Sequence, residues 1–173
     1  MFERIGIPIF RVLYQKTLIM KKLILVACFA LFVSASLSAQ NYTTALGLGI
    51  DFGDGVTFVG PSVKHAFAEH HVGQAELGFE DGATAITALY QYHDQFENAG
   101  GLYWFAGGGA SLFLIDGGDS LFSLRGTVGL DYKIPDVPLA FSFDWRPALA
   151  LDSDVNDRFE AGAFGIGIRY VLN

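Results

Sequence analysis

Residues 101–114 have the sequence Gly-Leu-Tyr-Trp-Phe-Ala-Gly-Gly-Gly-Ala-Ser-Leu-Phe-Leu, a long uncharged run without proline. The apolar residues do not follow helical spacing, so the run predicts a β-strand. One face, from Leu102 to Leu114, is wholly apolar, and the other, from Tyr103 to Phe113, mixes aromatic residues, glycine and serine. A soluble antiparallel sheet usually presents a polar face to water. We therefore interpret this run as a strand of a membrane β-barrel, with lipid outside and a crowded interior.

The N-terminal region has the features of a secretory signal. Lys21 and Lys22 precede an apolar core over residues 23–33, and small residues precede Gln40. We expect a helical signal peptide over residues 20–39, cleaved to leave a barrel domain over residues 40–173. Residues 1–19 add nothing that such a signal needs, so we interpret them as an extension from a translation start placed too far upstream.

Cys28 is the only cysteine of the 173 residues. The sequence before it also matches a lipoprotein cleavage pattern, but the apolar run continues past it, which favours ordinary signal cleavage. Cleavage after Ala39 would leave a mature chain without a thiol, a disulfide or a cysteine metal site.

The mature chain is predicted to be strongly acidic. Removing residues 1–39 takes away one of the 18 acidic residues and five of the 11 basic residues, which leaves a net charge near −11. This balance argues against nucleic acid as a partner. Because 51% of the whole chain is hydrophobic, we expect the charges to occupy loops and the barrel interior, with lipid covering the apolar surface.

Turn signals divide the mature part into eight segments of strand character, spaced as in a meander of hairpins. The segments are residues 43–52, 57–67, 72–79, 83–93, 101–114, 121–132, 138–149 and 161–172. In the first, sixth, seventh and eighth, an apolar face opposes a face of small or charged residues, which is typical of a membrane barrel. The prediction is an all-β fold, an eight-stranded antiparallel up-and-down transmembrane β-barrel. Pro61 and Pro147 each remove a ladder donor, so we expect a bulge or a strand end beside each.

The inward faces of these segments collect four acidic and four basic residues. They are Asp51, Lys64, Glu76, Arg125, Asp131, Asp144, Arg146 and Arg169. Buried charges are costly unless they are paired, and side chains can fill an eight-stranded barrel, so we interpret the set as a balanced network that plugs the interior. The alternative is a gated or leaky ion path in which some pairs rearrange.

Outward aromatic residues gather at the end of the barrel that holds both termini. They are Tyr42, Tyr92, Trp104, Tyr132 and Tyr170, which predict an aromatic belt at a membrane interface. An even number of strands places both termini on the side from which such barrels are inserted, so we expect this end to face the periplasm.

Sites for metals and catalysis are weakly indicated. Asp152, Asp154 and Asn156 resemble the opening of a calcium loop, but the glycine at position six and the glutamate at position twelve are missing, so an acidic loop is the simpler interpretation. His70 and His71, with Glu69, offer another candidate metal site. The simpler interpretation is that these three are solvated turn residues.

The predicted outer end has serines but no histidine, which argues against a catalytic serine–histidine pair. We expect no cofactor and no enzymatic activity.

Several strands resemble those of a family of small Gram-negative outer-membrane β-barrel proteins. The resemblance rests on Leu-Tyr-Gln-Tyr-His at 89–93, residues 101–109, Leu-Asp-Tyr at 130–132 with Ile134-Pro135, and Phe-Asp-Trp-Arg-Pro-Ala at 143–148, and it covers essentially all of 41–172. The architecture is similar to that of OmpX/Ail-type and OmpA-type barrels. The resemblance implies an outer-membrane location, with lipid, lipopolysaccharide and the insertion machinery as partners, but no particular activity. That machinery usually reads a final aromatic residue, whereas this chain ends Tyr170-Val171-Leu172-Asn173.

Three classes of function fit these features. The first is a monomeric outer-membrane barrel with a structural, envelope-integrity or surface-interaction role. The second is a narrow, low-conductance pore or a lipid-modifying outer-membrane enzyme on the same scaffold. The third is a secreted lipocalin-like barrel that binds a ligand, which would turn its apolar residues inward instead of outward.

Overall fold

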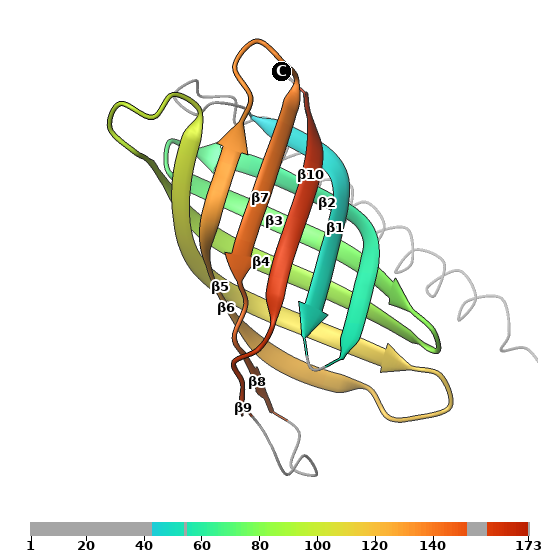
Figure 1. The fold of residues 1–173 in the computed structure, drawn as a ribbon. Helices are drawn as coiled ribbons and strands as arrows, with labels where there is room; N and C mark the ends of the chain where they lie inside the picture. Colours follow the sequence, from blue (N-terminus) through green and yellow to red (C-terminus); the bar gives the residue numbers. More distant parts are fainter. Residues whose placement is uncertain (1–42, 54, 152–158, 173) are drawn as a thin grey trace, which may run out of the picture. The chain divides into compact units, whose positions relative to one another are not determined.

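The computed structural model describes residues 43–53, 55–151 and 159–172. The predicted extension and signal peptide, Tyr42, and the calcium candidates Asp152, Asp154 and Asn156 lie outside the described residues. All regular elements in the described residues are strands (Figure 1). They are β1 (Thr44–Gly53), β2 (Val56–Ala68), β3 (His71–Glu80), β4 (Ala83–Gln95), β5 (Leu102–Ile115), β6 (Leu121–Lys133), β7 (Leu139–Trp145), β8 (Ala148–Ala150), β9 (Phe159–Glu160) and β10 (Phe164–Leu172).

No helix in the described residues is long and apolar enough to span a membrane.

The strands form a closed antiparallel barrel with eight strand positions around its wall. We call the strand, or the two short strands, at each position a stave. Each stave pairs with its neighbour in the chain, and β10 pairs with β1 through partners such as Val171 and Ala45, which closes the ring. β7 and β8 are two parts of one stave, and β9 and β10 are two parts of the last. The predicted fold is confirmed, and the predicted segment boundaries differ from the observed ones by two residues or fewer.

The expected irregularity beside Pro147 is present. The stave of β7 and β8 keeps one register against β6, because Trp145 pairs with Val128 and Ala148 pairs with Arg125. Against the last stave, however, Ala148 pairs with Glu160, whereas the amide of Arg146 donates to the carbonyl of Ala163. One extra residue therefore lies between Glu160 and Ala163, which is a β-bulge opposite the proline that has no N–H to donate.

The same expectation is wrong for Pro61. β2 runs through this residue without a break, and the pairs Val59 with Phe79 and Ser62 with Glu76 flank it in one register. The irregularity of β2 lies instead between Ala66 and Ala68. Pro61 pairs with Leu48 of β1, and neither Gly60 nor Pro61 has a registered partner on β3. The missing N–H donor of Pro61 is therefore accommodated by a local gap of two residues in the pairing between β2 and β3.

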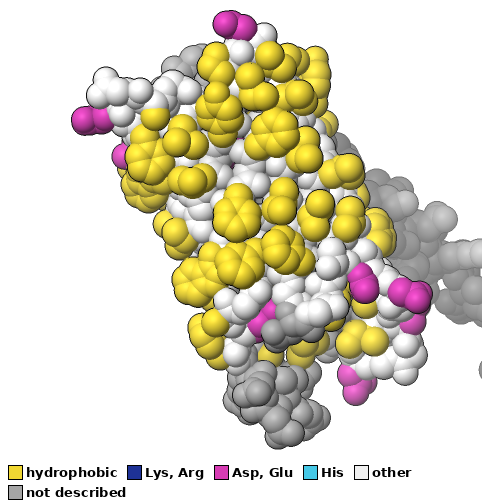
Figure 2. Space-filling model, in the orientation of Figure 1, with side chains coloured by type: hydrophobic (Ala, Val, Ile, Leu, Met, Phe, Trp, Pro, Cys, Tyr) yellow, Lys and Arg dark blue, Asp and Glu magenta, His cyan; other side chains and the backbone are white. Residues whose placement is uncertain are grey.

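Burial alternates along the staves and places the polar residues inside. On β6, Ser123, Arg125 and Thr127 are buried, whereas Leu124 and Val128 are about half exposed. Figure 2 shows apolar side chains covering the middle of the face formed by β7, β10 and β1, with acidic side chains near its two ends. The polarity is the reverse of that of a soluble barrel, and a lipocalin-like arrangement with apolar residues inward does not describe it.

Two rims can be distinguished. We call the rim with the start of β1 and the end of β10 the terminal rim, and the rim with the turns at 53–56, 80–83 and 115–121 the distal rim. Gly82 and Gly117 have φ angles of 72° and 73°. These left-handed conformations favour glycine and keep the two hairpin turns short.

Candidate functional site

The barrel interior contains all eight charged residues that the sequence predicted there. Six of them are at most 6% exposed, and the side chains of Asp51 and Glu76 are 12% and 8% exposed. On the strands that carry them, the charged residues alternate with outward apolar residues, because successive side chains of a strand point to opposite faces. These eight residues form two clusters.

The larger cluster is a chain of ion pairs in which two carboxylates bridge three arginines. Glu76 contacts Arg169 at 3.1 Å and Arg146 at 2.5 Å. Asp51 contacts Arg146 at 3.5 Å and Arg125 at 3.0 Å. The chain therefore links β10, β3, the junction of β7 and β8, β1 and β6 across the lumen.

Arg146 is the centre of this cluster. Its Nε lies 2.5 Å from Oδ2 of Asp144, and Thr127 donates to the same carboxylate oxygen at 2.9 Å. Arg146 thus contacts three carboxylates and is itself fully buried. Three arginines face three acids, so the cluster is neutral as a whole, which is the condition under which buried charges are tolerated.

The smaller cluster is the pair Lys64 and Asp131, at 2.6 Å. The Lys64 ammonium also lies 4.3 Å from the centre of the Phe105 ring, and His93 stacks on that ring with a centroid distance of 4.9 Å. Both members of the pair are buried, and their opposite charges balance each other. β2 and β6 lie on opposite sides of the ring of staves, and this pair therefore also crosses the lumen.

Glycine on the last stave makes room for the two largest buried side chains. A Cβ atom at Gly165 would overlap the guanidinium of Arg146, and one at Gly167 would overlap that of Arg169. Arg169 also donates to the hydroxyls of Ser62 and Ser142 at 3.0 and 2.7 Å. The glycine-rich inward face is therefore the space in which the guanidinium groups lie.

A row of uncharged polar side chains extends the network toward the terminal rim, and the sequence analysis missed it. His93 contacts Gln91 at 2.9 Å, Gln91 donates to Gln74 at 2.9 Å, and Gln74 donates to Glu76 at 2.7 Å. The signal was present, because these residues occupy alternate positions of the third and fourth predicted segments. The prediction from sequence included only the charged residues of those faces.

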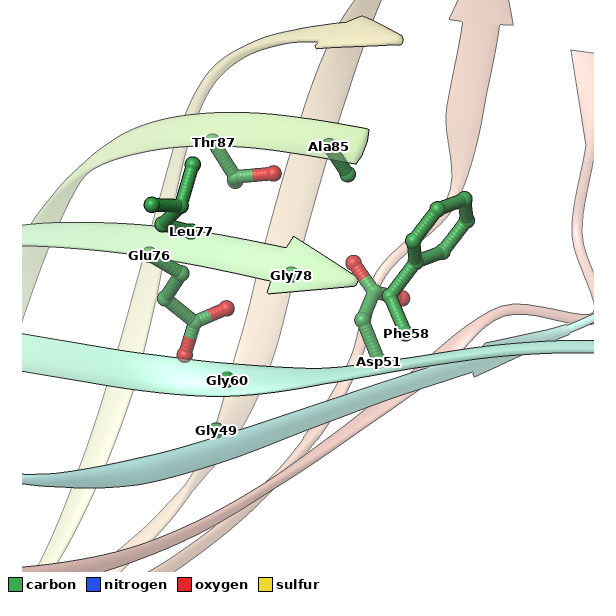
Figure 3. A pocket seen from close by; sticks show the side chains of 9 residues that line it. All are labelled: Gly49, Asp51, Phe58, Gly60, Glu76, Leu77, Gly78, Ala85 and Thr87. Atoms are coloured by element: carbon green, nitrogen blue, oxygen red, sulfur yellow. The ribbon is translucent and has the colours of Figure 1, made fainter. Parts of the chain in front are cut away.

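A small cavity lies next to the larger charge cluster. This cavity, beside Asp51 and Glu76, has a volume of only about 10 Å³, which is about the room one water molecule needs. Figure 3 shows the carboxylates of Asp51 and Glu76 beside it, with Gly49 on β1 and Gly60 on β2. Near the distal rim, the rings of Phe58 and Phe113 pack against each other inside the barrel, with their centroids 5.5 Å apart.

The four described members of the predicted aromatic belt all face outward near the terminal rim. Tyr92 and Trp104 lie on adjacent strands with ring centroids 6.0 Å apart. Tyr132 and Tyr170 lie near the ends of β6 and β10, and both are exposed. The predicted fifth member, Tyr42, lies outside the described residues.

The histidine alternative for a metal site finds no support in the described part of the chain. No group of three or more His, Cys, Asp or Glu side chains there is arranged to hold a metal ion. His70 contacts the backbone carbonyl of His93 through Nδ1 at 2.8 Å, and His71 contacts the Tyr90 hydroxyl at 2.5 Å. Both imidazoles therefore belong to the outward aromatic surface.

The fold and the interior define a class of protein: a closed eight-stranded antiparallel barrel with an apolar exterior and a neutralised polar interior. No protein-family model, curated protein or solved structure matches this chain.

Proposed function

We propose that this chain is an integral outer-membrane β-barrel with a structural or surface-interaction role in the cell envelope. The observation that carries the proposal is the polarity of the wall. Outward positions of the strands bear apolar side chains such as Phe143, Val128 and Ile168, each about half exposed, whereas ionised groups are sealed inside. In water this surface would cost free energy over the whole circumference, and in a bilayer it is the favourable arrangement.

The same reasoning supports an orientation. The start of β1 and the end of β10 lie at the terminal rim, which we assign to the periplasm, and the distal rim then faces outward beside lipopolysaccharide. Its described turns carry the acidic residues Glu80, Asp81, Asp116 and Asp119. The insertion machinery of the outer membrane would act on the folding chain, and the wall has no open edge that would require a second copy, which favours a monomer.

The proposed role involves no catalysis and no steady ion flow. Each of the eight charges in the two clusters is held by an opposite charge, and the cavity beside Asp51 and Glu76 admits about one water molecule. Opening a path would require separating pairs that cross the lumen at 2.5–3.5 Å. These features favour a plugged barrel over the pore and the enzyme that the same scaffold could host.

Cell fractionation and gel migration test the proposal. The protein should sediment with outer membranes, and its folded form should migrate differently on a gel before and after heating. Recovery in the soluble periplasm would overturn the membrane assignment. A stable ion conductance of the purified protein in planar bilayers would overturn the plugged interior while leaving the location intact.

A further inference from the structure

One charged residue departs from the pattern of the wall. Among the outward positions of the described strands, Asp94 of β4 is the only Asp, Glu, Lys or Arg. It continues the outward series that contains Tyr90 and Tyr92, one step closer to the terminal rim. A carboxylate on a wall that faces lipid is unfavourable unless it lies at the level of the headgroups and has a partner there.

Aromatic rings surround this carboxylate. Asp94 is the direct register partner of Trp104 on β5, and side chains opposite each other on such a pair are neighbours. The ring of His70 stacks on that of Tyr92 at 5.1 Å, and the ring of Tyr92 lies 6.0 Å from that of Trp104. β4 and β5 are adjacent strands (Figure 1), and the ring contacts therefore form a continuous surface beside Asp94.

The described residues do not neutralise this carboxylate. Its nearest titratable partner is Nδ1 of His70, at 3.9 Å, which is too long for a hydrogen bond. That nitrogen contacts the backbone carbonyl of His93 at 2.8 Å. Because a carbonyl can only accept, the proton on Nδ1 is directed to it and not to Asp94. The Asp94 side chain remains 45% exposed, and within the described part of the chain it accepts a hydrogen bond only from the amide of Gln95.

A carboxylate among aromatic rings at a membrane interface has the chemistry of an ammonium site, because ring faces and carboxylates both attract such a cation. We propose that Asp94, Tyr92 and Trp104 bind the ammonium group of an amine-bearing phospholipid headgroup of the ethanolamine type. This inference rests on the proposed membrane location, with the terminal rim in the periplasmic leaflet. The site prefers a primary ammonium over a quaternary one, since only the former donates hydrogen bonds to the carboxylate, and it disfavours anionic headgroups.

Lipid competition measured by fluorescence tests the site. The chain has two tryptophans, so a Trp145→Phe background leaves Trp104 as the only reporter. The full-length protein is reconstituted into vesicles that mix brominated phosphatidylethanolamine with unlabelled phosphatidylcholine. In a second set of vesicles the phosphatidylcholine is brominated and the phosphatidylethanolamine is unlabelled. Quenching of Trp104 should show that ethanolamine lipid associates about three to five times more strongly than choline lipid, the size expected for one exposed ion pair with a ring contact.

Three variants separate this site from general effects of the rim. Asp94→Asn should bring the preference close to unity, and Asp94→Glu should retain it. Glu97→Gln, which removes an exposed carboxylate from the turn after β4, should leave it unchanged. No preference in the parent protein, an equal preference in Asp94→Asn, or a preference for phosphatidylglycerol would each overturn the inference.

The membrane location and the lipid site fail in different ways. A chain that does not float with the vesicles contradicts the proposed function itself. A chain that floats, and whose Trp104 fluorescence is quenched equally by both lipids, contradicts only the headgroup site.

Discussion

Removal of Arg146 is the sharpest perturbation of the interior. The substitution Arg146→Met keeps most of the side-chain length and deletes the charge that contacts Asp51, Glu76 and Asp144. Two of these acids keep a cation, because Asp51 still contacts Arg125 and Glu76 still contacts Arg169. Asp144 keeps only the hydroxyl of Thr127.

The structure therefore predicts that the substitution leaves one carboxylate, that of Asp144, without a cation, and not three. Breaking a buried pair by removing one partner costs about 3–5 kcal/mol, and we expect the free energy of unfolding to fall by about that amount. Adding Asp144→Asn should recover at least half of the loss, because the remaining Arg125, Arg169, Asp51 and Glu76 are again neutral. This recovery distinguishes a charge effect from a packing effect.

Urea titration of the protein in detergent micelles, followed by tryptophan fluorescence, measures these free energies. The heat-dependent shift in gel migration checks independently that each variant has formed the barrel. Lys133→Met is the control, because this lysine at the mouth of the barrel contacts only the carbonyl of Ile134 among the contacts described, and surface changes of this kind cost less than about 0.5 kcal/mol. A loss below about 1 kcal/mol for Arg146→Met, or a double variant no more stable than the single one, would refute the reasoning.

Three further changes test other parts of the structure. Leu124→Arg places a charge on the outward face of β6, where Leu124 is 45% exposed, and should lower the free energy of unfolding in bilayers by about 2–4 kcal/mol. Val137→Arg, in the turn after β6, should leave it unchanged. Equal losses for the two variants in a urea titration would argue against a lipid-facing wall. Gly167→Ala adds a Cβ atom that overlaps the Arg169 guanidinium and should cost about 1–3 kcal/mol by overpacking, while Gly100→Ala, which meets nothing within 4 Å, should not change the urea midpoint. Lys64→Met should leave Asp131 without its cation at 2.6 Å and lower stability by about 3–5 kcal/mol, and full recovery by Asp131→Asn would show that charge, and not the contact with Phe105, is responsible.

The fold and the composition of the interior could be predicted because both depend on local patterns. Alternation along a strand has a period of two, so the face that carries Arg125 and Asp131 is separated from the face that carries Leu124 and Leu130 within a few residues of sequence. Turn residues such as Gly82 and Gly117 mark where one stave ends and the next begins. Six of the eight charged residues predicted to face inward are therefore buried, and the side chains of the other two, Asp51 and Glu76, are only 12% and 8% exposed.

The pairing of those charges could not be predicted in this way. Arg146 contacts Glu76, 70 positions away in the chain, and Lys64 contacts Asp131, 67 positions away. In both cases the partners lie on opposite sides of the ring, so no strand register connects them directly. The choice of partner depends on how far the staves are tilted and shifted when the barrel closes. The sequence prediction also failed at Pro61 of β2. Whether its missing N–H donor breaks the strand depends on how β2 pairs with β1 on one side and with β3 on the other.

The sequence alone determined that this chain forms an eight-stranded barrel, which face of each strand is apolar, and that the interior charges balance. The tertiary structure decided that three arginines and three acids join into one neutral cluster around Arg146, that two glutamines link this cluster to His93, and that Asp94 lies beside Trp104. The physical reason is that side-chain alternation is a property of a few consecutive residues, whereas contacts across the lumen and between staves exist only after the ring has closed in one register.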